Sequence, residues 1–156
     1  MKNTLNIDFK KLFLPLLPVF FVCFFIQNGI AQEEQTASLT VEVSNIKETK
    51  GTLFIALYNK AAGFLIEGKQ FLMKTIEVTK TRISHTFQDI PIGSYAVAVM
   101  HDVNDDGKCN RNFLGIPKEG FGFSTNRKPI LKEPSFDQVK IEVEEDTTIE
   151  IRLLHY

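Results

Sequence analysis

Apolar and polar positions alternate in several short runs once the N-terminal segment has passed. In the first run Leu39, Val41 and Val43 alternate with polar residues, which is the period-2 pattern of a strand with one face in water. Residues 52–59 follow a Lys-Gly turn and carry apolar side chains at both odd and even positions. Burial of both faces is typical of a strand inside a sheet. We therefore expect residues 52–59 to form a central strand.

Two further runs, residues 75–79 and 82–87, are separated by Lys80-Thr81 and predict a β-hairpin. In the second run Ile83, His85 and Phe87 fall on one face. A lone histidine among apolar neighbours is typically a hydrogen-bonded structural residue. We therefore interpret His85 as structural.

A turn at residues 90–93, Ile-Pro-Ile-Gly, leads into an apolar run from Ser94 to Asp102. Proline fixes φ in such a turn, and glycine permits a positive φ. Tyr95 stands at the start of the predicted strand. We expect it to be a corner tyrosine, with its hydroxyl group bonded to the preceding turn.

After Asp102 no periodic pattern returns until Phe136. A span of this length without regular structure is uncommon in a compact domain unless it binds something or wraps the surface. Two runs then close the chain, residues 139–143 and 149–153, and a turn at residues 145–147 joins them. Their odd positions are apolar and their even positions polar, which predicts two final strands.

These runs predict an all-β fold, an antiparallel immunoglobulin-like or prealbumin-like sandwich of about seven strands with one long loop; a barrel is the alternative. Residues 60–69 contain two glycines and predict a loop whose Phe64 and Leu65 cover an end of the core. We expect residues 32–37 to form a linker and residues 38–156 to form a single domain. A chain of this length buries enough surface for one hydrophobic core.

The N-terminus has the pattern of a secretory signal. Three lysines precede the run from Leu12 to Ile26, which is apolar except for two prolines and is shorter than a membrane-spanning helix requires. Small residues at Gly29 and Ala31 predict cleavage before Gln32, which makes residues 1–31 a signal peptide. We therefore expect an exported protein, periplasmic, secreted or at the cell surface, with no stable membrane span after cleavage.

Charge and cysteine content narrow the function further. Removal of residues 1–31 leaves 15 basic and 18 acidic residues, a formal charge of −3. This balance gives no reason to expect a nucleic-acid partner. Cys109 is the only cysteine outside the predicted signal, and it has no internal partner for a disulfide. We interpret it as an inert thiol in a loop, with an intermolecular disulfide as the alternative.

One segment of the long loop matches the start of a calcium-binding loop. Asp102, Asn104 and Asp106 occupy the first, third and fifth positions, and Gly107 occupies the sixth. Alternate residues of a tightly curled loop point to one side, and calcium prefers the hard oxygens that such residues carry. The expected ligands are the side chains of Asp102, Asn104, Asp106 and Asn110 and the carbonyl oxygen of Lys108.

The rest of the calcium-loop pattern is absent, because the twelfth position is Phe113 and not a bidentate glutamate. Two carboxylates without that glutamate predict weak binding, with a Kd on the order of 10⁻⁴–10⁻³ M. The alternative is that Asp, Asn and Gly only form hydrogen-bonded turns and hold no metal. Zinc and copper are disfavoured, because thiolate clusters and paired histidines are missing and His101 should point to the opposite face from Asp102.

Three functions remain open. We expect a noncatalytic binding or structural module whose partner is an unknown protein or small ligand. A second hypothesis is a carrier for a small apolar or sugar ligand that uses residues 113–123, although we expect these phenylalanines to fold back over an open end of the sandwich. A third is an enzyme built on His101, Asp102 and Glu119, for which the sequence shows no nucleophile and no phosphate loop.

The stretch IPIGSYAVAVMHDVNDDGKCNRNFLGIPKEGFGFS, followed by FDQVKIEV, resembles a family known as domain of unknown function 2141. The similarity rests on a Pro-Gly-Tyr turn, a strand that ends in His101-Asp102, an Asn-x-x-Gly-Lys loop and a run of glycine and phenylalanine. It covers nearly all of the chain from Leu39 onward. It implies an exported β-sandwich protein of Gram-negative bacteria and implies no activity, while Asp105 and Cys109 are not assumed to follow the family pattern.

Overall fold

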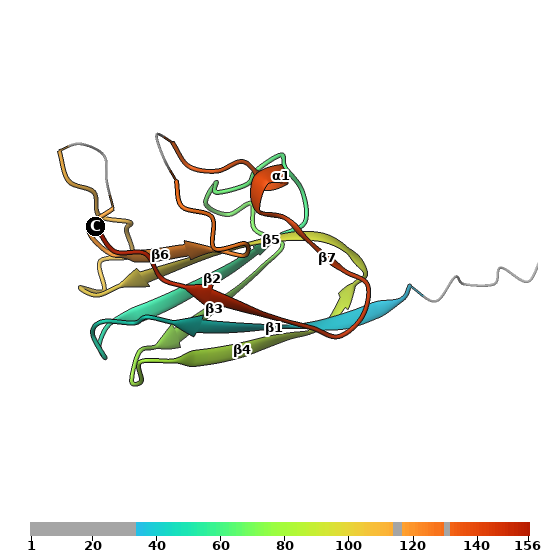
Figure 1. The fold of residues 1–156 in the computed structure, drawn as a ribbon, viewed down its shortest axis with the longest axis horizontal. Helices are drawn as coiled ribbons and strands as arrows, with labels where there is room; N and C mark the ends of the chain where they lie inside the picture. Colours follow the sequence, from blue (N-terminus) through green and yellow to red (C-terminus); the bar gives the residue numbers. More distant parts are fainter. Residues whose placement is uncertain (1–33, 114–116, 130–131) are drawn as a thin grey trace, which may run out of the picture. The chain divides into compact units, whose positions relative to one another are not determined.

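The computed structural model describes residues 34–113, 117–129 and 132–156 (Figure 1). The predicted signal peptide and the first two linker residues lie outside these ranges, as do short parts of the long loop. The described ranges form eight strands in two sheets and one four-residue helix, α1 (Phe136–Val139). None of their helices has the length and apolar character needed to cross a membrane.

The smaller sheet has three strands in the order β4-β1-β8. Its central strand is β1 (Thr36–Ser44), which pairs antiparallel with β4 (Ile83–Pro91) and parallel with β8 (Thr147–Arg152). The expectation of a purely antiparallel fold is therefore wrong for β1 and β8. The first residues of β1 lie inside the segment predicted as a linker.

The larger sheet has five strands, and the fold is not a closed barrel. β3 (Leu72–Glu77), β2 (Thr52–Tyr58), β5 (Gly93–Asp102) and β6 (Gly120–Phe123) follow one another across it. β7 (Ile141–Val143) pairs with the start of β5, along the same edge that β6 uses further on. The predicted central strand is confirmed, because β2 lies between β3 and β5.

The predicted hairpin of residues 75–79 and 82–87 is wrong, because β3 and β4 belong to different sheets. Between them Val78 is buried in the core, and its N–H donates to the Gly51 carbonyl oxygen over 2.9 Å. The chain therefore turns across the end of the fold instead of folding back beside β3. Two strands joined by a short polar segment look alike in sequence whether they pair or face each other.

The last two strands show the same behaviour. β7 pairs with β5 and β8 pairs with β1, so the turn at residues 145–147 joins the two sheets and does not close a hairpin. This crossing takes place at the end where β1 starts, and β8 therefore runs in the direction of β1. The observed strand β7 also begins later than predicted. Val139 belongs to α1, and the strand starts at Ile141.

β6 is a strand that the periodicity did not predict. Its sequence is Gly-Phe-Gly-Phe, and all four residues are buried. A Cβ atom on Gly122 would lie 2.6 Å from Cγ2 of Ile151, and one on Gly120 would lie 2.7 Å from Cε1 of His155. Only glycine leaves room for these side chains on the inner face, while Phe121 and Phe123 point to the outer face.

Two apolar clusters cover the two faces of the larger sheet. The first lies between the sheets and is formed by inward side chains of both, among them Leu39, Val41, Leu53, Ile55, Val97, Val99 and Ile151. The second lies on the outer face and contains Tyr58, Ala96, Phe121, Phe123, Phe136 and Val139. Phe64 and Leu65 pack on this second cluster, so they cover the outer face of the sheet and not an end of the inner core. In Figure 1, α1 and the smaller sheet lie on opposite sides of the larger sheet.

Two structural predictions for single residues can be compared with their surroundings. Tyr95 is a corner tyrosine as expected, because its hydroxyl group donates to the Pro91 carbonyl oxygen over 2.5 Å. His85 lies half-buried beside Phe87, with the rings edge to face and their centres 4.7 Å apart. Burial lowers the pKa of His85, and the nearby charge of Lys74 adds to this shift.

Candidate functional site

The outer face of the larger sheet carries rows of apolar side chains that follow from the strand register. One row across β3, β2, β5 and β6 consists of residues at directly paired positions, Met73, Ala56, Ala98 and Phe123. The neighbouring row contains Phe54, Met100 and Phe121. Because side chains two apart along a strand share a face, both rows point away from the inner core.

Small residues in the middle of the first row make this face hollow. Ala56 and Ala98 lie opposite each other, and the larger Met73 and Phe123 stand on either side of them. The resulting groove has a volume of about 710 Å³. That is within the size range of small-ligand sites in proteins. The side chains that form the floor of the groove are only half-buried. The rest of this face of the sheet is covered by α1 and residues 64–65.

The walls of the groove come from loops that lie far apart in sequence. One wall contains Gly107, Cys109, Arg111 and Pro117. The other walls are formed by Leu65, Glu67, Gly68, Gln70, Pro129, Lys132, Glu133 and Tyr156. The Arg111 guanidinium donates to Glu133, and this contact raises the pKa of Arg111. The pair connects two loops at the rim and leaves the floor apolar.

The phenylalanines of the long loop divide between two environments. Phe121 and Phe123 are buried, but as part of β6 they lie on the outer face of the larger sheet and do not cover an open end of the sandwich. Phe113 is instead 95% exposed, so it covers nothing in the described part of the chain. Phe121 and Phe123 also form part of the lining of the groove. The same two phenylalanines therefore cover part of the sheet and line the groove beside it.

The segment predicted to bind calcium forms a compact loop beside the groove. Asp102 ends β5 and is 1% exposed. Its two carboxylate oxygens accept hydrogen bonds from the backbone N–H groups of Asp106, at 3.3 Å, and Gly107, at 2.7 Å. Asp105 and Gly107 have positive φ angles of 56° and 73°, which curl the loop back toward Asp102. The first predicted ligand thus holds the loop closed.

Three other predicted ligands lie together. Oδ2 of Asp106 accepts hydrogen bonds from the side-chain amides of Asn104, at 3.0 Å, and Asn110, at 2.7 Å. Oδ1 of Asp106 accepts from the backbone N–H of Lys108 over 2.9 Å. The Asn110 and Asn104 amides, and then the Lys108 N–H, hold the pKa of Asp106 below its ordinary value. The structure therefore brings Asn104, Asp106 and Asn110 into one cluster.

Glu119 is a residue whose role the sequence did not indicate. It is 7% exposed, and its Oε1 accepts from the Val103 N–H over 3.0 Å while Oε2 accepts from the Asn110 N–H over 3.3 Å. A buried carboxylate with two charge-assisted hydrogen bonds is a strong constraint on a loop. Glu119 therefore fixes the end of the loop that Asp102 begins.

The loop offers oxygen atoms that could bind calcium, but only a modest number of them. Carboxylate oxygens keep lone pairs beyond those used by one N–H donor, so Asp102 and Asp106 retain acceptor capacity. Within the described ranges no group of three or more His, Cys, Asp or Glu side chains is placed to hold a metal. A cation here would depend on amide and carbonyl oxygens as well as the two carboxylates.

The geometry gives no support to the enzyme hypothesis. His101 is fully buried on the inner face, and its Nε2 lies 2.8 Å from the Lys50 carbonyl oxygen. Its Nδ1 has no partner in the described part of the molecule. Asp102 faces the opposite side of β5, and both Asp102 and Glu119 accept backbone hydrogen bonds. The three groups do not present an acid and a base to a common substrate.

Cys109 lines the groove and is half-buried. Burial raises the pKa of its thiol, an effect that nearby Arg111 partly offsets. A thiol with a raised pKa is a weak nucleophile at neutral pH. This agrees with the interpretation of Cys109 as an unreactive loop residue.

The comparisons with known proteins give one result. The sequence model of a bacterial family, described as uncharacterized protein conserved in bacteria (DUF2141), matches residues 41–151. No curated protein and no solved structure matches the chain. The match covers seven of the eight strands completely or nearly so, and it includes the calcium-like loop and every lining residue of the groove except Tyr156. The chain therefore belongs to the DUF2141 family of bacterial proteins.

Proposed function

We propose that this protein is an exported, noncatalytic binding module, an immunoglobulin-like or prealbumin-like sandwich whose ligand site is the groove on the outer face of the larger sheet. The observation that carries the proposal is the depression of about 710 Å³ over Ala56 and Ala98. Sheet faces that only pack against solvent are ordinarily polar. Here the even positions from residue 54 to 58 of β2 and from residue 96 to 100 of β5 are all apolar or aromatic, although part of this face stays open.

The lining favours a small apolar ligand, or an amphipathic one with a short polar end. Most side chains around the groove are aromatic, methionine, alanine or proline. The charged side chains at its rim include Arg111, Lys132 and Glu133, of which Arg111 and Glu133 already bind each other. A sugar presents hydroxyl groups on every side and would leave many of them without partners on such a floor. An apolar chain has no polar groups that would be left without hydrogen-bond partners on this floor.

Methionines suit a site of this kind. Met73 is 51% exposed at one end of the alanine row, and Met100 stands in the next row. Their flexible, polarizable side chains adapt to ligands of different shape. We expect selectivity for apolar length and bulk more than for one particular molecule.

The proposal is tested by filling the groove from its floor. In the variant A98L the added branched side chain would occupy space equal to about three methylene groups. At about 0.8 kcal/mol for each buried methylene, binding of dodecanoate should weaken by about 2 kcal/mol, roughly 30-fold. Titration calorimetry on the purified protein measures this change.

The matched control is A62L, because Ala62 is exposed in the loop that follows β2 and is not part of the groove. This variant should bind dodecanoate as the native protein does. Equal affinity of A98L and the native protein would overturn the proposal. Binding of maltose in place of dodecanoate, lost in A98L, would keep the site and reverse its chemistry.

We also propose that the loop from Asp102 to Asn110 binds calcium weakly, as a stabilising ion and not as a catalyst. Support comes from the side chains of Asn104 and Asn110, which both lie against the carboxylate of Asp106. A Kd on the order of 10⁻⁴–10⁻³ M follows from two carboxylates and no bidentate glutamate.

A thermal melt separates this idea from a loop held by hydrogen bonds alone. Calcium at 100 times its Kd should stabilise the native state by about 2.7 kcal/mol, and magnesium should do so less. D106N should remove the calcium shift, while E77Q, a change of an exposed carboxylate on β3, should keep it. An unchanged melting temperature in several millimolar calcium would contradict the proposal.

A further inference from the structure

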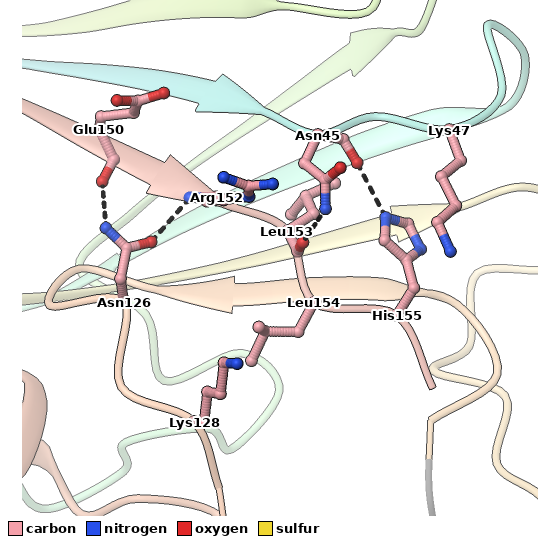
Figure 2. Close-up of a pocket in the computed structure, with 9 residues that line it drawn as sticks. All are labelled: Asn45, Lys47, Asn126, Lys128, Glu150, Arg152, Leu153, Leu154 and His155. Atoms are coloured by element: carbon pink, nitrogen blue, oxygen red, sulfur yellow. Dashed lines mark hydrogen bonds between the residues drawn. The ribbon is translucent and has the colours of Figure 1, made fainter.

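A second pocket, separate from the apolar groove, lies beside the free edge of β8 (Figure 2). Its volume is about 630 Å³. It is formed by the segment after β1, the segment after β6, and the end of β8 with the residues that follow. Its lining residues are Asn45, Lys47, Asn126, Lys128, Glu150, Arg152, Leu153, Leu154 and His155.

The charges around this pocket are predominantly positive. Lys47, Lys128 and Arg152 are exposed, and none of them forms an ion pair within the described ranges. A sphere of this volume has a radius of about 5 Å, which is shorter than the screening length of about 8 Å at physiological salt. The fields of the three cations therefore overlap inside the pocket.

The acidic groups nearest in sequence to these cations already have partners elsewhere. Glu150 accepts a hydrogen bond from Ser44 over 2.7 Å and lies 3.5 Å from Arg82. Figure 2 shows its carboxylate pointing away from Asn126, which binds the Glu150 carbonyl oxygen instead. Glu48 forms an ion pair with Lys50 at 2.9 Å. The positive charge of the pocket is thus left without a counterion from these residues.

Two asparagines hold the pocket in shape. Asn126 pairs with the open edge of β8, because its Nδ2 donates to the Glu150 carbonyl oxygen and its Oδ1 accepts from the Arg152 N–H, each over 2.7 Å. Asn45 donates from Nδ2 to the Leu153 carbonyl oxygen over 2.7 Å, and its own carbonyl oxygen lies 2.9 Å from Nε2 of His155. The backbone that carries Lys47 and Arg152 is therefore fixed before any ligand arrives.

We propose that this pocket binds a small anion that carries two or more carboxylate or phosphate groups. Lys47, Lys128 and Arg152 supply the charge, and the guanidinium of Arg152 can bind one oxyanion with two hydrogen bonds. Unpaired cations that line one concave site on a protein of net negative charge are an arrangement that attracts anions. The site is independent of the apolar groove, from which it shares no residue.

Citrate and inorganic phosphate are the probes, titrated into the purified protein by calorimetry at fixed ionic strength. The triple variant K47Q/K128Q/R152Q should weaken binding of citrate at least about tenfold, since each exposed contact contributes up to about a factor of five. The control K60Q/K74Q/K80Q removes the same charge from exposed lysines outside both pockets and should change the dissociation constant less than about twofold.

A lipid headgroup is a second source of the same phosphate chemistry, and flotation with phosphatidylglycerol vesicles, compared with phosphatidylcholine vesicles, identifies it. Binding to the anionic vesicles alone, lost in the triple variant, would assign the site to a headgroup. Absence of binding to citrate, phosphate and anionic vesicles would overturn the proposal. Equal losses in the triple variant and its control would also overturn it, because the effect would then come from net charge. Unchanged circular dichroism of R152Q alone, with weaker binding, excludes unfolding as the cause.

Discussion

Replacement of Glu119 by glutamine tests whether a buried carboxylate holds the long loop in place. The native side chain accepts two backbone hydrogen bonds, from Val103 at 3.0 Å and from Asn110 at 3.3 Å. Glutamine keeps one oxygen acceptor but places an N–H group where the second oxygen was. One buried N–H donor then faces another donor, and the charge that strengthened both bonds is lost.

Hydrogen bonds to charged groups contribute about 1.5–3 kcal/mol, and an unsatisfied buried donor costs about 1–3 kcal/mol. We therefore expect E119Q to destabilise the closed loop by about 2 kcal/mol. Amide hydrogen exchange measures the stability of the loop separately from that of the sheets, because opening of the loop exposes its amides without unfolding the sheets. The amide protons of Val103 and Asn110 should exchange about 30-fold faster in the variant.

E77Q is the matched control, because Glu77 is exposed at the end of β3 and its side-chain carboxylate makes no hydrogen bond or ion pair in the described part of the chain. Its amide exchange rates should equal those of the native protein. The reasoning would be refuted if Val103 and Asn110 exchanged at native rates in E119Q. It would also be refuted if amides throughout both sheets accelerated equally, since the effect would then be global.

Three further predictions concern packing, pH and the thiol. G122A should lower the free energy of unfolding by about 1–3 kcal/mol in urea titrations, because the new Cβ would lie 2.6 Å from Ile151; an unchanged midpoint would refute the close approach. Asp106 should titrate below its ordinary pKa of 3.8 by NMR, and N110A should raise that pKa. Because a lowered pKa stabilises the folded loop at higher pH, the stabilisation should disappear as the pH falls through the folded-state value, and a pKa at or above 3.8 would contradict this. Alkylation of Cys109 should keep rising above pH 9.0, because burial raises the thiol pKa; a plateau below that pH would contradict it.

The strands that the sequence predicted well have strong apolar patterns. β1 follows from alternation, and β2 and β5 follow from apolar runs; the apolar even positions of β2 correctly indicated that its outer face is at least partly covered. Alternation does not identify a strand's partner, however. The turns at residues 80–81 and 145–147 look like hairpin turns, but each carries the chain to the other sheet. Which occurs depends on long-range packing, such as the burial of Val78.

The candidate site was only partly accessible from sequence. The Asp102 to Gly107 spacing indicated a closed loop, and the structure shows one. Glu119 was named only as a possible enzyme residue, and its role in fixing the loop gave no signal, because its hydrogen-bond partners lie 9 and 16 residues earlier in the chain. The groove depends on Ala56 and Ala98 facing each other across two strands, which requires the register. β6 was not predicted because its alternate positions are glycines, which give no apolar pattern. These positions are glycine because Ile151 and His155 pack too close to leave room for a side chain.

We propose that the outer face of the larger sheet is a ligand site, and methyl NMR during a dodecanoate titration can locate the bound ligand on that face. Ala98 and Met100 line the groove floor, whereas Val97 points into the inner core from the same strand. If dodecanoate enters the groove, the methyl signals of Ala98, Met100 and Met73 should shift saturably, and the Val97 methyl signals should stay nearly unchanged. No saturable shift at the groove methyls, or equal shifts on both faces of β5, would contradict it.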